Sequence, residues 1–539
     1  MADVRPFRPL QYEPAAGPLG ELVSPPYDVI SPEERRGYLA RSPYNAVRLI
    51  LPDVDYEEVG GLIASWREQG VLGAPEGPRI IAWTQSFTLD DGVPRERRTL
   101  LAAVGLEPYE RRLVRPHERT HAGPKEDRLR LTRAVRTNLS PVFGLYRDPA
   151  GEAWAAAGVS GPPDAELTDL EGTVHRLWHV DDPAAWDGIA RAMRDRWILI
   201  ADGHHRYETA LAYRDELRAA GGSEDAPFNR VMMGLTALDD PGLVVLPTHR
   251  VLTRWPEGAE EGFEATPAGD AGELVAALAE APDDRTALGL LRPDGARLLL
   301  GPPEDDPSPA ARLDVAVLER RILLPRLGAD QAALTSEGVL GYTKDAREAE
   351  RLVASGEAAA AVLLRPIPKS AVAAVAEAGE TMPQKSTYFF PKLLTGVAFH
   401  PLVDARRPGG ARRRRPRLAG GGAGGGGGDP RRHRGAHPRA ARRAARAGRG
   451  RRPHAARRPR GRRRDHRRAR GVRAPADAGE RGDRRARDRR GRAARGGGRP
   501  DRREPERLAR AARVLHLGRR GRGAGDGGRP ARRRRRPLH

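Results

Sequence analysis

Residues 1 to 399 predict an α/β or α+β protein with a mixed sheet and flanking helices. Short apolar runs of strand length alternate with amphipathic segments of helical length. Turn residues such as Asp90-Asp91-Gly92 join strand pairs into hairpins, which a purely parallel sheet lacks. A stretch of about 400 residues without an internal repeat is long enough for two or three packed subdomains.

Helices are predicted where apolar side chains recur every three or four residues. The helix over residues 56–69 ends at Gly70, a common helix stop, and the helix over 128–139 is basic. The predicted helices cover residues 56–69, 128–139, 183–195, 206–220, 312–327, 345–355 and 369–380.

Strands are predicted from short runs rich in β-branched and aromatic residues. One hairpin joins 79–87 to 97–109, and another spans 286–300 with Pro293-Asp294-Gly295 as its turn. Residues 231–238 and 243–252 are expected to be adjacent strands. The other predicted strands cover residues 47–51, 141–146, 197–201 and 359–364.

The charge of the chain is divided very unevenly. The net charge is +23, yet residues 400–539 contain 50 arginines, no lysine and 11 acidic residues. Subtracting them from the whole leaves 45 basic and 61 acidic residues in 1–399, a net charge of −16. The front part is therefore an acidic body, and we expect it to bind no nucleic acid.

Composition also limits the chemistry and the compartment. The chain has no cysteine, which excludes disulfides, cysteine-based zinc sites and thiol catalysis. Its first residues lack an apolar signal core, and no apolar run approaches the roughly 18 residues of a membrane span. We expect a cytoplasmic protein without membrane contact.

The segment 400–539 is predicted to be a low-complexity, disordered tail and a product of frameshifted translation. It uses only nine residue types, all encoded by codons that begin with G or C. Reading GC-rich DNA out of frame moves its GC-rich third codon positions into first place and gives this residue set. The alternative is a genuine basic arm that binds nucleic acid, but such arms usually interleave aromatic residues for stacking.

The frameshift prediction can be checked in the DNA. Shifting the reading frame by one base near codon 399 should give a normal residue mixture or an early stop. A clean genomic sequence translated in the present frame would contradict it.

The sharpest local signal is the strand 197–201, which runs into Asp202-Gly203-His204-His205-Arg206 and then directly into a helix. A helix N-terminus presents unpaired N–H groups and a partial positive charge, so it suits a phosphate. Gly203 allows close backbone approach, and Arg206 can hold two oxygens in a fork. The structural alternative is that Asp202 caps the helix and the histidines form hydrogen bonds within the turn.

This segment resembles the Asp-Gly-His-His-Arg signature of the ParB/sulfiredoxin-like superfamily, and within it most of all the free serine kinases. The resemblance covers a dozen residues in a fitting strand–turn–helix context. It implies that the turn from Gly203 to Arg206 holds nucleotide phosphates.

Four more segments, together with that one, resemble the family called domain of unknown function 1015. They are residues 24–30, 116–128, 246–250 and 385–392, and as a set they span essentially all of 1–399. We therefore expect one globular body over these residues. The family has no established activity, so the resemblance implies no reaction.

His117-Glu118-Arg119-Thr120-His121 matches the HExxH pattern of zinc proteases. That chemistry needs both histidines one turn apart on a stable helix. Gly123-Pro124 follows almost at once and limits any helix to a single turn. We predict no metal site and keep metal-dependent hydrolysis as a minor alternative. We interpret the segment as a polar loop that contributes Glu118, Lys125 and Arg128, or else as a salt-bridged surface loop.

Three shorter features complete the candidate site. His249 and Arg250 end an apolar strand, where they either contact a ligand or form a strand-end hydrogen-bond cluster. Lys385 and Lys392 have phosphate-binding character without the Gly-rich loop of a Walker motif. Asp28 comes after Pro25-Pro26-Tyr27 and is interpreted as a general base or as a helix cap.

Two classes of function remain open. The first is an enzyme that transfers a phosphoryl group from ATP or ADP, with Mg²⁺, to a small hydroxylated metabolite. The second is a non-catalytic, nucleotide-binding regulatory protein similar to ParB-type switches. The candidate catalytic residues are Glu118, Asp28 and Asp202, and the candidate cofactor-binding residues are Gly203, His204, His205, Arg206, Lys125, Arg128, His249 and Arg250. We expect 202–206, 118–128 and 249–250 to lie around one pocket.

Overall fold

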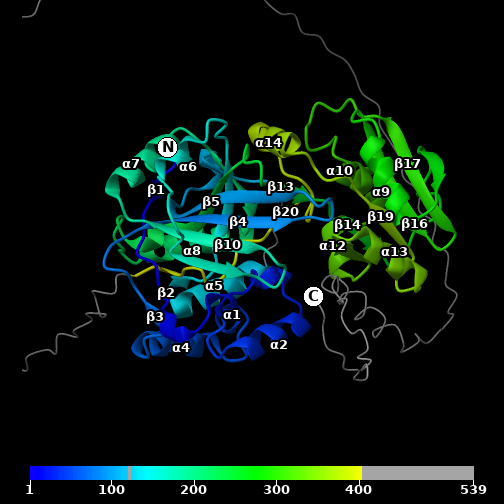
Figure 1. Cartoon of the computed structure of the whole chain (residues 1–539). Helices are drawn as coiled ribbons and strands as arrows, with labels where there is room; N and C mark the ends of the chain where they lie inside the picture. Colours follow the sequence, from blue (N-terminus) through cyan, green and yellow to red (C-terminus); the bar gives the residue numbers. More distant parts are fainter. Residues whose placement is uncertain (119–122, 404–539) are drawn as a thin grey trace, which may run out of the picture. The chain divides into compact units, whose positions relative to one another are not determined.

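The computed structural model describes residues 1–118 and 123–403 (Figure 1). The strands in these ranges form a nine-stranded sheet, a six-stranded sheet and three two-stranded pairs, with helices on the sheet faces. All described residues belong to one compact unit. The predicted α/β class with a mixed sheet and flanking helices is confirmed. The segment 404–539, with most of the predicted tail, lies outside the described residues.

The nine-stranded sheet is mixed. Its strands, in spatial order, are β6 (Val114–Pro116), β11 (Ile198–Asp202), β8 (Val142–Tyr146), β12 (Arg230–Ala237), β5 (Pro94–Gly105), β4 (Ile80–Thr88), β10 (Val174–Val180) and β9 (Ala165–Thr168), with β1 (Val4–Arg5) beside β5. β11 runs parallel to β6 and antiparallel to β8. The predicted β4–β5 hairpin is confirmed, and Gly92 in its turn has a φ of 71°.

Alternate residues of these strands enter two different cores, as the period of two in a strand requires. On β11, Ile198 and Ile200 pack beneath helices, whereas Leu199 and Ala201 face the opposite core. The helices on the first face are α6 (Glu152–Ala156), α7 (Pro183–Met193) and α8 (His204–Ala219). Because both faces are covered, β11 is an unbroken apolar run, and this made it predictable.

The six-stranded sheet has the order β15 (Glu264–Ala268), β17 (Gly295–Pro303), β16 (Arg285–Arg292), β19 (Ala360–Leu363), β14 (His249–Leu252) and β18 (Leu340–Thr343). Helices α9 (Ala271–Glu280) and α13 (Ala346–Ala354) lie against β16 and β19 (Figure 1). Ala287 and Leu291 belong to that core, and Leu288 and Leu290 to the opposite one. The opposite face meets α10 (Asp314–Leu318), a π-helical turn (Glu319–Leu323), α11 (Leu324–Leu327) and α12 (Gln331–Ser336).

The remaining elements surround these sheets. The helices are α1 (Leu19–Leu22), α2 (Pro32–Arg41), α3 (Val47–Ile50), α4 (Tyr56–Glu68), α5 (Gly123–Val135) and α14 (Lys369–Ala378). The strand pairs are β2 (Gln11–Tyr12) with β3 (Leu72–Gly73), β13 (Val244–Leu246) with β20 (Tyr388–Phe390), and β7 (Thr137–Asn138) with β21 (His400–Pro401). No helix in the described ranges is long and apolar enough to cross a membrane.

The prediction of a strand over residues 47–51 is wrong, because α3 occupies it. The side chain of Asn45 accepts a hydrogen bond from the Val47 N–H and donates to the carbonyls of Glu21 and Val23. This buried amide starts a helical turn in a run that is apolar enough to be a strand. A tertiary contact thus overrides the local β propensity.

The prediction that 231–238 and 243–252 are adjacent strands is also wrong. β12 lies in the nine-stranded sheet, β13 pairs with β20, and β14 belongs to the six-stranded sheet. Pro247, which has no N–H to donate, separates β13 from β14 and ends the first of them. The strand predicted over 243–252 is therefore two strands in two different sheets.

Candidate functional site

The candidate site lies where two neighbouring parallel strands end. β11 ends at Asp202, and His117 and Glu118 directly follow the end of β6. Ligand groups commonly gather beyond the carboxyl ends of parallel strands, because side chains from separate segments meet there. The segment 384–392, which contains β20, also reaches this place through contacts with Glu118 and Asp202.

The turn after β11 depends on Gly203. Its φ of 89° is in the left-handed region, and a Cβ atom there would lie 2.9 Å from Cζ of Arg206. The guanidinium of Arg206 therefore lies directly over this backbone. Gly203 is the N-cap of α8, and among the described residues no side-chain cap hydrogen bond is formed there. The alternative interpretation of Asp202 as a helix cap is thus wrong, because Gly203 occupies the N-cap position.

Asp202 instead binds two cations. Its Oδ2 lies 3.1 Å from Nη2 of Arg206 and 3.7 Å from Nζ of Lys392. Burial would raise the pKa of this carboxyl group, but the charges of Lys392, Arg206 and Lys385 outweigh burial and lower it. Asp202 is therefore an anion whose nearest charged neighbours are the cations Arg206 and Lys392, with Lys385 within electrostatic reach.

Glu118 is bound to the loop that carries Lys385. Its Oε1 accepts the N–H groups of Ser386 at 3.1 Å and Thr387 at 3.4 Å, and its Oε2 accepts the N–H of Lys385 at 3.3 Å. Burial raises the pKa of Glu118, but the hydrogen bond and charge of His117 and further charges nearby lower it to about 2. Glu118 is therefore an ionised loop anchor.

Two histidines connect β6 to α8. The backbone N–H of His117 donates to Nε2 of His204 at 3.3 Å, so the proton of His204 must lie on Nδ1. His117 Nδ1 bonds to the Ile200 carbonyl, and its Nε2 lies 2.9 Å from Thr387 Oγ1. Burial, with the charge of His117, lowers the pKa of His204 to about 3. His204 is neutral and joins the segments of the site.

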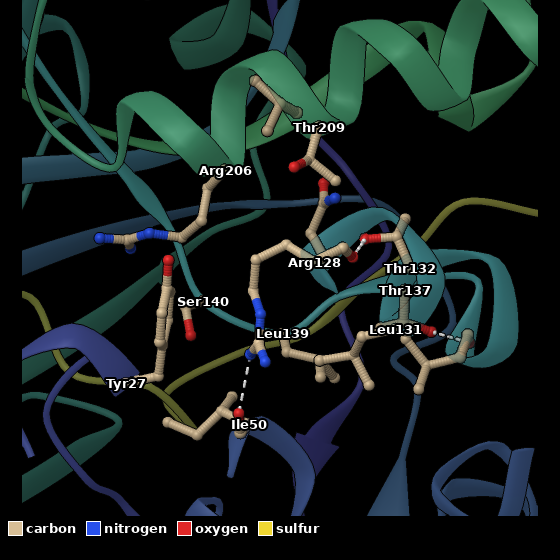
Figure 2. A pocket seen from close by; sticks show the side chains of 13 residues that line it. Tyr27, Ile50, Arg128, Leu131, Thr132, Thr137, Leu139, Ser140, Arg206 and Thr209 are labelled. Atoms are coloured by element: carbon tan, nitrogen blue, oxygen red, sulfur yellow. Dashed lines mark hydrogen bonds between the residues drawn. The ribbon is translucent and has the colours of Figure 1, made fainter. Parts of the chain in front are cut away.

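A small cavity lies beside the turn. Figure 2 shows Arg206 extending from α8 above the ring of Tyr27, with Arg128 opposite, bonded to the Ile50 carbonyl at 2.9 Å. The cavity encloses about 50 Å³, enough for a few water molecules but not for a nucleotide. Arg206 also donates a hydrogen bond to the carbonyl of Pro141, which follows the cavity-lining Ser140. Its side chain thus connects this edge of the cavity to Asp202.

Asp28 lies close to these groups and is exposed. Its charge contributes to the raised pKa values of Arg206 and Tyr388, so it lies within electrostatic reach of both. It does not cap a helix, because Ser31 caps α2 in a reciprocal capping box with Glu34. With the described residues it forms no hydrogen bond or ion pair, which leaves its carboxylate available.

The other predicted site residues lie in more structural surroundings. Lys125 pairs with Glu208 of α8, and Arg128 also donates to Tyr56, 3.1 Å away. His205 follows His204 on α8 and is half-buried. The structure thus places Glu118 near residues 202–206. Lys125 contacts the next turn of α8 through its ion pair with Glu208.

His249 and Arg250 meet the site only indirectly. Nδ1 of His249 accepts the Leu364 N–H at 3.1 Å within the six-stranded sheet. Arg250 is fully buried and donates to Gln331 and to the Gln384 carbonyl, next to Lys385. Both residues form the strand-end hydrogen-bond cluster of the structural alternative, and Arg250 supports the loop that Glu118 anchors.

The HExxH pattern is not helical at its start. His117 and Glu118 follow a strand, and Glu118 forms an isolated β-bridge with Met382. His121 lies outside the described residues. Among the side chains that the structure describes, no group of three or more metal-binding residues occurs. The described part of the pattern thus lacks the helix that zinc proteases need.

Lysine content is a signal that our sequence analysis did not use. The chain has 95 basic residues but only five lysines: Lys125, Lys344, Lys369, Lys385 and Lys392. Three of them gather here, because Lys344 and Lys392 lie 5.0 and 4.4 Å from the Tyr388 ring and the charge of Lys385 acts on Asp202. In an arginine-rich chain, such a cluster singles out the surroundings of Tyr388 and Asp202.

Three buried histidines predict a marked acid sensitivity. Burial lowers the pKa of His204 to about 3 and those of His249 and His400 to about 4. The unfolded chain takes up these protons near pH 6.5, so stability is complete above that pH and falls as the pH drops toward 4. Each histidine gives a slope of up to about 1.4 kcal/mol per pH unit. Urea unfolding at pH 7 and pH 5 should differ strongly, and equal midpoints would contradict the prediction.

A family model matches the chain, and several solved structures are distantly similar to it. No curated protein sequence matches the chain. A free serine kinase in complex with AMP has 14% identity and a TM-score of 0.30, covering 54% of this chain and 88% of its own. A conserved hypothetical protein from Pyrococcus furiosus has 15% identity and a TM-score of 0.28, covering 52% of this chain and 89% of its own. Scores this low carry no argument about activity.

The family model gives the firm assignment. It matches residues 4–316, more than half of the chain, including strands β6 and β11 and the turn at Gly203. The chain therefore belongs to the family described as "Protein of unknown function (DUF1015)".

Proposed function

We propose that this protein binds ATP or ADP at the start of α8 and transfers its terminal phosphoryl group to a small hydroxylated metabolite. The observation that carries the proposal is the convergence of Lys392, Arg206 and Lys385 on Asp202, beside the N-terminus of α8 at Gly203. Oriented N–H groups and cations are the usual means of holding phosphates. Phosphoryl transfer is catalysed mainly by such positioning and charge.

Each part of the site has a role in this proposal. The N–H groups of the first turn of α8 hold phosphate oxygens at the close approach that Gly203 permits. The ammonium groups of Lys392 and Lys385 neutralise charge on the transferring phosphoryl group. Arg206 already bonds Asp202 and Pro141, and it presents its remaining donors to the same oxygens.

Asp28 is the general base of the proposal. It is exposed, whereas Glu118 accepts three backbone N–H groups and Asp202 is paired with cations. The acceptor hydroxyl gives its proton to Asp28, and its oxygen bonds to the terminal phosphorus. The bond from that phosphorus to the bridging oxygen breaks, and the shortened nucleotide leaves.

Mg²⁺ fits the site only as a partner of the nucleotide. Magnesium is commonly held by one or two carboxylates plus substrate phosphates, and it does not need a full protein cage. Asp202 is the carboxylate at the proposed phosphate position and would be its protein ligand. When bound, the ion would neutralise phosphate charge.

The proposal is tested by titrating the purified chain with ATP, ADP, GTP and AMP, with and without MgCl₂, in a calorimeter. Binding of ATP or ADP is expected to require the phosphates, so AMP should bind more weakly. Turnover is then followed by ³¹P NMR with a panel of small alcohols and hydroxy acids. Binding without any transfer would favour the regulatory alternative, and absence of binding would overturn the proposal.

Arg206→Lys separates phosphate binding from turn architecture. The lysine keeps the charge and loses the fork, so nucleotide affinity should fall by roughly 1–3 kcal/mol. The melting temperature should fall as well, because Arg206 also joins Asp202 to the Pro141 carbonyl. Calorimetric titration and thermal melts measure the two effects separately.

Arg218→Lys on the same helix is the matched control. Arg218 donates to the Asn229 side chain at 2.6 Å, so its loss should lower the melting temperature and leave nucleotide affinity unchanged. Unchanged affinity in both variants would leave Arg206 as scaffold only.

A further inference from the structure

Arg97 is a buried cation with too few partners. It lies on β5 with no exposed surface, and its Cζ is 4.6 Å from the centroid of the Phe143 ring. Within the described ranges it has no ion-pair partner, and its Nε and Nη1 form no hydrogen bond. Its hydrogen bond runs from Nη2 to Oε1 of Gln85. Burying such a charge is costly, so stability alone does not explain this arginine.

Gln85 connects Arg97 to the candidate site through two hydrogen bonds of its side-chain amide. It lies directly opposite Arg97 on β4 and is also fully buried. Arg97 can only donate hydrogen bonds, so the amide oxygen of Gln85 must face it. The amide NH₂ then points the other way and donates to the carbonyl of Lys392 at 3.1 Å. Arg97 thereby fixes the orientation of an amide that would otherwise turn over.

The Gln85 amide therefore holds the backbone carbonyl of Lys392, while the Lys392 side chain reaches Asp202 in the candidate site. Its Nζ lies 3.7 Å from Asp202 and 4.4 Å from the centroid of the Tyr388 ring. A shift of the carbonyl would move the ammonium group relative to both. Supporting residues of this kind set the precision of a charged group.

We propose that Arg97 and Gln85 are positioning residues that hold Lys392 against Asp202, a role whose catalytic consequence rests on the proposed function. Arg97 orients the Gln85 amide, the amide fixes the Lys392 carbonyl, and the ammonium group is thereby directed at the phosphate. The buried charge is kept for this orientation at the expense of stability.

Two substitutions separate positioning from stability. Gln85→Glu gives Arg97 a carboxylate partner but takes away the donor to Lys392, so the melting temperature should hold or rise while Lys392 loses its support. Arg97→Met keeps the packing on Phe143, removes the buried charge and frees the amide to turn over. If Arg97 and Gln85 served stability alone, any substitution that disturbed Lys392 would also lower the melting temperature.

Lys392 can be observed directly, because the chain has only five lysines. After reductive ¹³C-methylation, each lysine gives its own methyl signals, and Lys392→Arg identifies those of Lys392. In the wild type the Tyr388 ring should shift these signals, since the ammonium lies close to the ring. In both variants this shift should shrink. ADP binding with MgCl₂ should weaken roughly three- to tenfold, the worth of one hydrogen bond.

Arg98→Met is the matched control. Arg98 is the next residue on β5, and its Nε pairs with Asp240 at 3.0 Å. Its loss should lower the melting temperature without changing the Lys392 signals or ADP affinity. Unchanged Lys392 signals in both Gln85→Glu and Arg97→Met would overturn the positioning role. A wild type that binds no ADP would overturn the proposed function, and the NMR comparison would still decide the positioning.

Discussion

Asp28→Asn is expected to lower the rate of the proposed phosphoryl transfer by a factor on the order of 10² to 10⁴. An amide cannot take the proton of the acceptor hydroxyl, and this factor is the usual contribution of a general base. Nucleotide affinity should change little, because the turn at Gly203 and the cations of the phosphate site remain in place. Folding should be unaffected, since Asp28 is exposed. Steady-state kinetics with ATP and the best acceptor measures the effect.

Glu33→Gln is the matched control for this substitution. Glu33 is also exposed and lies five residues further along the chain, in the first turn of α2. It should keep the wild-type rate. If Asp28→Asn also kept it, the base would have to be sought elsewhere and the available carboxylate would have no catalytic part.

Lys392→Met should cost about 10² to 10³ in turnover, or roughly 3–4 kcal/mol of transition-state stabilisation. Methionine fills much of the same space beside Tyr388 but brings no charge to the transferring phosphoryl group. Removing the ammonium also takes away one of the two ion pairs that Asp202 forms with the described residues. The kinetic loss should therefore come with a modest fall in melting temperature.

Lys344→Met controls for stacking on the aromatic ring. Lys344 lies 5.0 Å from the same Tyr388 ring, but its ion pair is with Glu171 at 3.5 Å. Turnover of this variant should stay near that of the wild type. Equal losses in the two lysine variants would assign the effect to the packing of Tyr388, and the idea of a phosphate-directed ammonium would fail.

The turn at the centre of the site could be predicted because its determinants are adjacent in sequence. An apolar strand, a glycine suited to positive φ and an amphipathic helix follow one another from Ile198 to Ala219. The same local logic predicted the β4–β5 hairpin and α4. It failed at α3, where the buried amide of Asn45 makes contacts more than twenty residues away.

The partners within the site could not be predicted, because they come from distant segments. Glu118 looked like a free carboxylate in a polar loop, yet its oxygens accept N–H groups some 270 residues further on. Lys392 lay in a segment of phosphate-binding character, but nothing in its surroundings indicated Asp202. The HExxH pattern was misleading for the opposite reason. Its residues are close together in sequence, but His117 and Glu118 follow a strand and do not lie on a helix.

The late arrival of Lys392 also matters for biosynthesis. Asp202 leaves the ribosome 190 residues before Lys392, and the family match ends at residue 316, before either lysine of the loop. At 5–20 residues per second, Asp202 and Arg206 are made roughly 10 to 40 seconds before Lys392. A nascent or prematurely terminated chain thus carries the turn at Gly203 without the ammonium groups that would act on a phosphate. In our proposal, activity appears only when synthesis of the body is nearly complete, so that unfinished chains do not consume nucleotide.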